Sequence, residues 1–254
     1  MIFSANLGFL WTELSLPDAI RAAKRAGFDA VECHWPYDTP AEQVVQALSE
    51  TGLAMLGLNT NRGNTGAGDN GLSALPGREA EARAAIDQAI DYAHAIGAGK
   101  VHVMAGFASG PDAHATFVEN LRYACAKAEQ LDIGLLVEPL NRYDAPDYFL
   151  QTTEQAVAII DEVSSDALHL MFDCYHVQLM EGDITNRLKS LMPRIGHIQF
   201  ASVPDRGAPD HGEVDYGYIF KLLDTLGYRK PLGAEYKPGG DTDATLGWLR
   251  SVKA

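Results

Sequence analysis

One rhythm recurs along the chain: an amphipathic helical segment, then a glycine, then a short apolar run. It is seen over residues 26–32, 96–103, 133–138 and 226–235. Gly27, Gly97, Gly134 and Gly227 are placed where a helix C-terminus needs a left-handed residue, which glycine adopts at little cost. The rhythm predicts repeated units in which a helix and a strand alternate.

The helical segments have one apolar face each, with the period of an α-helix. Ile86, Ile90 and Ala93 share such a face, and so do Phe117 and Leu121. Strands are predicted near residues 3–9, 30–35, 55–60, 100–106, 135–140, 168–174, 195–201 and 231–236.

Each predicted strand is followed by a helical pattern, which gives eight βα units and a parallel sheet. Eight units close into a (β/α)8 TIM barrel more readily than they form an open doubly wound sheet, although the pattern does not exclude the open sheet. The 254 residues contain no linker, so residues 1–254 are predicted to form a single α/β domain.

The glycine-rich stretch over residues 59–77 lies between a predicted strand and a helix. In a barrel this position is a loop over the catalytic face, although a loose surface insertion fits the composition equally well. The stretch lacks both the order G-x-G-x-x-G and a following Gly-Lys-Ser/Thr, which argues against binding of nucleotide phosphates.

Charge and targeting signals restrict the partners. A net charge of −14 opposes the phosphate contacts that dominate nucleic-acid binding, so no nucleic-acid partner is expected. The N-terminus shows no secretory pattern, and no apolar run approaches the ~20 residues that span a bilayer. Three cysteines without a Cys-x-x-Cys pair fit a reducing compartment. We expect a cytoplasmic protein without a membrane partner; a homo-oligomer is compatible with the sequence.

Four predicted strands end in a side chain that can bind a metal: Glu138, Asp173, Gln199 and Glu235. Each is separated from the next by about one βα repeat. All four should therefore project from the same end of the barrel, which is the catalytic end of this fold.

Three negative charges that converge at buried strand ends require a cation, because an unpaired buried carboxylate is costly. Ligands that are all oxygen favour Mg²⁺ or Mn²⁺, whereas a contribution from His176 or His197 would allow Zn²⁺. Taken singly, each carboxylate could instead be a cap or an ion-pair partner, but four residues in step favour a metal site.

Substrate contacts are predicted from residues beside these strand ends. His176 lies three residues beyond Asp173, where it could bind substrate oxygens or cap a helix. Arg206 could bind a substrate carboxylate through two parallel hydrogen bonds. Together with Lys237 and the metal, Arg206 would supply positive charge in an otherwise acidic protein.

These motifs resemble those of the hydroxypyruvate isomerase family, within the larger group of xylose-isomerase-like barrels, and the likeness runs the length of the chain. The motifs are Glu138-Pro139-Leu140-Asn141, Phe172-Asp173-Cys174-Tyr175-His176, His197-Ile198-Gln199, Gly212-Glu213 and Glu235-Tyr236-Lys237-Pro238.

The resemblance implies that Glu138 and Glu235 serve as metal ligands and also as the acid and base, with Asp173 and Gln199 completing the metal site. It further implies isomerisation of a small hydroxy-carbonyl acid, such as hydroxypyruvate or a 2-oxotetronate, by proton transfer through an enediolate. A hydride shift would use similar ligands.

Three other functions compete with this hypothesis. A ketose 3-epimerase or a sugar dehydratase would keep the metal, although the epimerases of this group usually have histidine at the position of Gln199. An endonuclease on a related barrel would need several zinc-binding histidines and a basic face. A non-catalytic sugar- or metal-binding protein would bind its ligand without turnover.

Overall fold

The structure is a computed structural model that describes residues 1–253. Within that range the residues form two compact units. The first unit contains Met1–Leu56, Asp173–Pro193 and the chain from His197 onward, and the second contains Gly57–Phe172 and Arg194–Gly196.

The first unit is built on parallel strands. Its strands are β1 (Phe3–Asn6), β2 (Ala30–Glu32), β3 (Ala54–Met55), β9 (Leu232–Ala234) and the greater part of β8 (Ile195–Phe200). Their order is β3, β2, β1, β9, β8, and Ser4 of β1 is paired with Ala30 on one side and with Gly233 on the other.

Helices follow these strands along the chain. They are α1 (Leu16–Ala26), α2 (Ala41–Thr51), α6 (Cys174–Met180), α7 (Ile184–Leu191), α8 (Tyr216–Thr225) and α9 (Gly247–Lys253), with 3-10 turns η3 (Met192–Arg194) and η4 (Asp243–Thr245). Helix α1 shows why they form: Ser15 caps its N-terminus, Pro17 lies in its first turn, and Gly27 ends it with a φ of 92°.

The core of the first unit contains an aromatic cluster. The ring of Phe3 packs edge to face against Phe200, Phe220 and Trp248, with centroids 5.2–6.0 Å apart. Phe3 and Phe200 are almost fully buried, so β1 and β8 are joined by apolar contact although β9 lies between them in the sheet.

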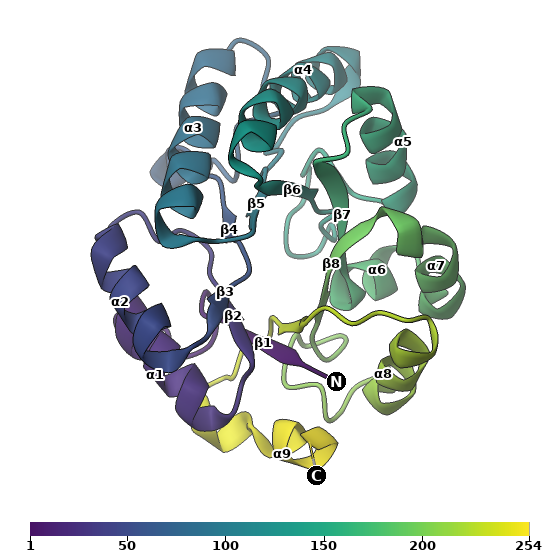
Figure 1. The fold of residues 1–254 in the computed structure, drawn as a ribbon. Helices are drawn as coiled ribbons and strands as arrows, with labels where there is room; N and C mark the ends of the chain where they lie inside the picture. The colour runs from purple at the N-terminus through teal and green to yellow at the C-terminus, as the bar shows by residue number, and fades with distance from the viewer. Residues whose placement is uncertain (254) are drawn as a thin grey trace. The chain divides into compact units, whose positions relative to one another are not determined.

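The second unit repeats the pattern. Its strands β4 (Leu58–Asn59), β5 (Lys100–His102), β6 (Gly134–Val137) and β7 (Leu168–Asp173, of which Asp173 belongs to the first unit) are parallel and adjacent in that order. Its helices are α3 (Glu79–Ile96), α4 (Gly110–Ala128) and α5 (Thr153–Val163), with 3-10 turns η1 (Thr65–Ala67) and η2 (Glu129–Leu131). Figure 1 shows α3, α4 and α5 in succession along one side of these strands.

The glycine-rich segment 59–77 is anchored rather than loose. The backbone of Ala74 donates to Ala105, and the buried Asn120 side chain donates to the carbonyl of Ser73 at 2.9 Å. Arg78 forms an ion pair with Asp69 at 2.8 Å. The interpretation as a loose surface insertion is therefore wrong for this segment.

Two details of the predicted elements are wrong. Gly134 is the first residue of β6 and does not end a helix; the 3-10 turn η2 extends α4, and Asp132 takes the left-handed conformation with a φ of 54°. The strand predicted over 55–60 is divided into β3, which pairs with β2, and β4, which pairs with β5. Within residues 1–253 no helix combines the length and apolar character needed to cross a membrane.

Candidate metal centre and active site

Three polar side chains of the first unit lie at strand ends. Asp173 ends β7 and caps the N-terminus of α6, where its Oδ1 accepts a hydrogen bond from the backbone of Tyr175 at 2.9 Å. Gln199 is the next-to-last residue of β8, and Glu235 directly follows β9. All three are almost completely buried.

Asp173, Glu235 and the buried His176 form a compact group. One ligand atom from each of them lies within 4.8 Å of the others. His176 Nε2 is 3.6 Å from Asp173 Oδ2. The sequence predicted a substrate contact for His176, and the structure places it among groups that can hold a metal ion.

Arg206 supplies positive charge to this group. Its Nη2 is 2.6 Å from Glu235 Oε2 and 3.8 Å from Asp173 Oδ2. The guanidinium also lies over the rings of Phe9 and Tyr175, 4.8 and 5.0 Å from their centroids. Its backbone has a φ of 57°, which few non-glycine residues adopt.

The two carboxylates differ in their electrostatic environments. Burial alone would raise the pKa of Glu235, but Arg206 and His34 outweigh it and bring the pKa to about 2. Burial and the neighbouring Glu235 raise the pKa of Asp173 to about 7, although Arg206 acts to lower it. Glu235 is thus stabilised as a carboxylate by the protein itself, and Asp173 is not.

The donor set fits a divalent cation. Within the described residues, Asp173 Oδ2 and Gln199 Oε1 are buried without a hydrogen-bond partner. A buried acceptor with no hydrogen-bond partner is costly, and a cation beside either oxygen would satisfy it; beside Asp173 the cation would also hold that carboxylate ionised. The buried acidic and histidine cluster is therefore able to hold a metal ion.

Three further residues contact the predicted ones and were missed as site residues. Asn6 donates through Nδ2 to Glu235 Oε1 at 2.8 Å, and His34 Nε2 lies 3.0 Å from the same oxygen. Glu32 is buried at the end of β2 and contacts Gln199. The signal for Glu32 was present, since it follows two apolar strand residues as Glu138 does.

Glu138 directly follows β6 in the second unit, and its side chain is buried. Its Oε2 lies 3.6 Å from His102 Nδ1. Burial, with Glu138 nearby, raises the pKa of the Tyr148 phenol above its usual range. The position at a strand end agrees with the sequence prediction.

Lys237 contacts the predicted residue Arg206 through its backbone. Its side chain is exposed, and its backbone N–H donates to the carbonyl of Arg206 at 2.7 Å. That bond ties the segment after β9 to the unusual turn at Arg206.

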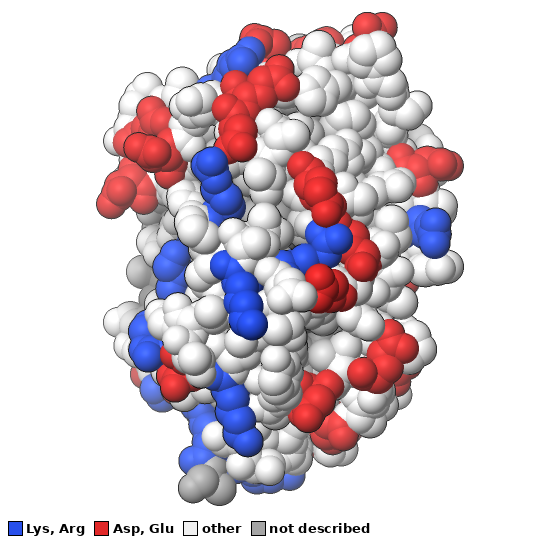
Figure 2. Space-filling model, turned by 90° about the vertical axis from the view of Figure 1, so that its right-hand side faces the viewer, with Lys and Arg blue, Asp and Glu red and all other residues white. Residues whose placement is uncertain are grey.

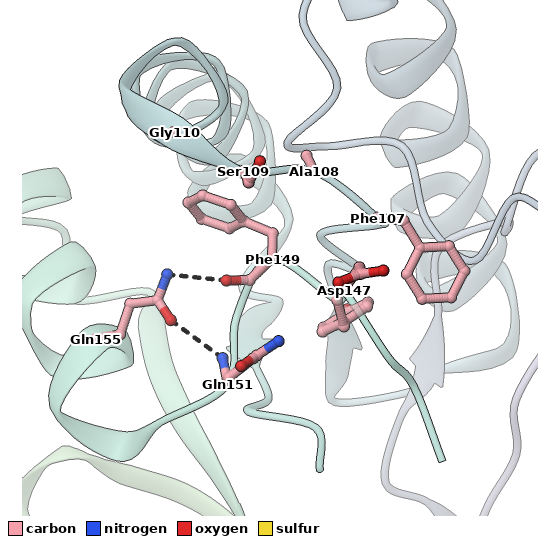
Figure 3. A pocket seen from close by; sticks show the side chains of 9 residues that line it. Phe107, Ala108, Ser109, Gly110, Asp147, Phe149, Gln151 and Gln155 are labelled. Atoms are coloured by element: carbon pink, nitrogen blue, oxygen red, sulfur yellow. Dashed lines mark hydrogen bonds between the residues drawn. The ribbon is translucent and has the colours of Figure 1, made fainter. Parts of the chain in front are cut away.

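The second unit also has a cavity of about 480 Å³ between the loop before α4 and the loop before α5. Figure 3 shows the Asp147 carboxylate beside the ring of Phe107, with Gln155 bonded to the backbone of Phe149 and of Gln151. The amide of Gln155 therefore serves the loop structure, and the lining supplies no group of the predicted metal centre.

With this geometry established, comparison with known proteins identifies the family. The model of the family described as xylose isomerase-like TIM barrel matches residues 20–252. The chain belongs to the xylose isomerase-like TIM barrel family. The predicted (β/α)8 barrel is thereby confirmed.

Relatives place the chain within that family. It is 43% identical to a 2-oxo-tetronate isomerase of Cupriavidus necator, over 98% of this chain and 97% of that one. It is 40% identical to the hydroxypyruvate isomerase of Escherichia coli, over 97% of both chains. A solved structure described as an AP endonuclease, family 2, from Brucella melitensis matches with a TM-score of 0.95 and 37% identity, over 98% of each chain. The resemblance to the hydroxypyruvate isomerase family is confirmed, and the protein is an isomerase.

Proposed function

We propose that this isomerase acts on a small hydroxy-carbonyl acid, converting hydroxypyruvate to tartronate semialdehyde or isomerising a 2-oxotetronate, with the help of a divalent metal. The names of the curated relatives support this substrate class. The metal is supported chiefly by two buried oxygens, Asp173 Oδ2 and Gln199 Oε1, that lack a hydrogen-bond partner within the described residues, and by the group that Asp173 forms with Glu235 and His176.

The metal would be held by Glu138, Asp173, Gln199 and Glu235, and Mg²⁺ or Mn²⁺ suits this set of oxygens best. His176, which lies within reach of Asp173, leaves Zn²⁺ open. When bound, the cation would supply positive charge beside the oxygens of the substrate, where negative charge develops during isomerisation.

Proton transfer is assigned to Glu138 and Glu235. Isomerisation removes a proton from one carbon and returns a proton to the neighbouring carbon, which requires a base and an acid. Arg206 and His34 hold Glu235 in the carboxylate form that a base must have, although the same contacts lower its pKa and weaken it as a base. Either glutamate can serve as the base with the other as the acid, and a hydride shift between the two carbons would use similar ligands.

Arg206, His176 and Lys237 are proposed to bind the substrate. Arg206 has the charge and planar geometry that bind a carboxylate, and Phe9 and Tyr175 hold its guanidinium from two sides. His176 is buried beside Asp173, where it could donate to a substrate oxygen. Lys237 is exposed beside the Arg206 turn and would add positive charge to that region.

The endonuclease alternative finds less support in the residues. The compact group of the first unit contains a single histidine, His176, among its carboxylates. The face in Figure 2 carries Lys and Arg side chains interspersed with Asp and Glu, without the continuous basic surface that nucleic-acid backbones require.

The test is NMR in D₂O of metal-free and Mg²⁺- or Mn²⁺-loaded protein with hydroxypyruvate, 2-oxotetronates and several ketoses. We expect metal-dependent isomerisation of the acids, with deuterium at the reacting carbon. Glu138→Gln and Glu235→Gln should abolish it, whereas Glu162→Gln, at an exposed surface ion pair, should not.

Each other result has a definite meaning. Isomerisation without deuterium uptake would point to shielded proton transfer or to a hydride shift. Turnover of ketoses alone would contradict the proposed substrate class and would indicate a sugar 3-epimerase. Binding without any product would overturn the proposed reaction in favour of a binding protein.

A further inference from the structure

Glu32 accepts hydrogen bonds from four side chains of the first unit. Its Oε2 accepts from Ser4 Oγ at 2.9 Å and from His197 Nε2 at 2.7 Å. Its Oε1 accepts from Asn6 Nδ2 at 3.1 Å and from Gln199 Nε2 at 2.8 Å. Both oxygens are thus engaged as acceptors, so a partner at hydrogen-bonding distance must present a donor.

This requirement fixes the orientation of the Gln199 amide. Its Nε2 donates to Glu32 at 2.8 Å and also lies 3.3 Å from Glu235 Oε1, so both amide hydrogens face carboxylates. A flipped amide would bring its oxygen against the oxygens of Glu32 and Glu235. The orientation that remains leaves Gln199 Oε1 buried and, within the described residues, without a partner.

The surroundings leave Glu32 and Gln199 little freedom to move. A Cβ atom on Gly233 would lie 2.6 Å from Glu32 Oε1 and 2.8 Å from Gln199 Cγ, so the two side chains fill the space over this glycine. Glu32 and Gln199 are 4% and 3% exposed, which excludes bulk water as an alternative partner.

We propose that Glu32 is a positioning residue for the metal centre: it holds the amide of Gln199 so that Oε1 is the atom offered to the cation. The inference rests on the proposed function, because it presumes that a cation binds beside Gln199. It goes beyond that function because it assigns a role to Glu32, which is remote from Gln199 in the sequence: the Glu32 carboxylate sets the orientation of the Gln199 amide. Partners that orient metal ligands in this way typically change metal affinity about 10- to 100-fold when they are lost.

The experiment measures Mn²⁺ affinity by calorimetry and the EPR spectrum of the bound ion in wild type, Glu32→Gln and the exchange variant Glu32→Gln/Gln199→Glu. In Glu32→Gln the new amide can donate its own N–H to Gln199. Gln199 Oε1 would then turn toward that donor and away from the cation. We expect the Mn²⁺ dissociation constant to rise about 10- to 100-fold, with an altered EPR spectrum at saturation.

The exchange variant restores a donor facing an acceptor, with the two partners interchanged. We expect it to recover most of the lost affinity, because one oxygen of the new carboxylate can accept from the new amide while the other faces the cation. Asp29→Asn is the matched control: Asp29 directly precedes β2, accepts from the Phe3 backbone and from Lys253, and has no contact with Gln199. It should keep wild-type affinity.

The outcomes separate the two proposals. Wild-type protein that binds no divalent cation would overturn the proposed metal-dependent function itself. Wild-type protein that binds Mn²⁺, with Glu32→Gln binding it equally well and with the same EPR spectrum, would overturn the role of Glu32 alone. If Glu32→Gln does not fold, the exchange variant decides: near-native affinity supports the inference, and folded protein with lost affinity refutes it.

Discussion

Replacement of Arg206 by glutamine should destabilise the metal-free protein far more than replacement of an arginine in an equally short ion pair at the surface. Arg206 Nη2 and Glu235 Oε2 are 2.6 Å apart, and their side chains are only 11% and 6% exposed. Arg194 Nη2 and Asp161 Oδ1 are also 2.6 Å apart, but those side chains are 49% and 50% exposed. The two pairs therefore differ in burial, and the guanidinium of Arg206 also lies over the rings of Phe9 and Tyr175.

Burial of the ion pair determines how large a loss in the free energy of unfolding we expect. Loss of Arg206 leaves the buried carboxylate of Glu235 without its cation and removes the guanidinium near Asp173, and breaking a buried pair in this way costs about 3–5 kcal/mol. For a chain of this size that corresponds to a fall in Tm of roughly 6–20 °C. Arg194→Gln should cost at most about 1 kcal/mol, because water solvates both of its partners.

Urea denaturation in EDTA, followed by circular dichroism, compares the two variants with wild type. A second series with saturating Mn²⁺ should reduce the deficit of Arg206→Gln, since the cation then neutralises the same carboxylates. If the free energies of unfolding lost by the two arginine variants differed by less than about 1 kcal/mol, the buried ion pair would contribute no more than an exposed one. Burial would then not be the deciding factor.

Three further predictions concern other parts of the molecule. Hydrogen bonds to Asp205 and, to a smaller extent, to Asp210 raise the pKa of His211. The stability that these contacts contribute is therefore present below the ordinary histidine pKa and is lost as the pH rises through the raised pKa of His211. Asp205→Asn should lower the pKa of His211 in an NMR titration. Gly233→Ala should weaken Mn²⁺ binding in calorimetry, because its Cβ would collide with the Glu32 and Gln199 side chains. Chelation should lower the Tm in calorimetry, since metal at 100 times its dissociation constant stabilises the folded state by about 2.7 kcal/mol; an unchanged Tm would contradict the metal site.

The architecture was predictable from local patterns because each βα unit carries its own signals. Residues 26–32 show this: a helix with an apolar face ends at a glycine of positive φ, and a buried strand follows. Such signals act over a few residues and do not depend on distant contacts. The ends of the strands were less predictable, because they depend on where the chain leaves the ladder. After Asn6, for example, the backbone turns as Phe9 and Leu10 donate to the Asn6 carbonyl.

The four metal ligands were predicted from their phase on successive strands, whereas Glu32 and Asn6 were not predicted as site residues. Glu32 was placed inside a longer predicted strand, over 30–35, so it did not register as a strand end. Its partners Gln199 and His197 lie 167 and 165 positions away. A pairing of that range leaves no local pattern, because it is created by the register of β2, β1, β9 and β8.

The pKa values of the buried carboxyl groups could not be predicted from the sequence. Asp173 and Glu235 carry the same group at corresponding strand ends, yet the pKa of Asp173 is raised to about 7 and that of Glu235 is lowered to about 2. Arg206 contributes to the difference because it is 2.6 Å from Glu235 and 3.8 Å from Asp173; His34 also contacts Glu235, while burial and the neighbouring Glu235 raise the pKa of Asp173. Two side chains outside the strands, Arg206 and His34, therefore help to determine which of these carboxylates the protein holds ionised by itself.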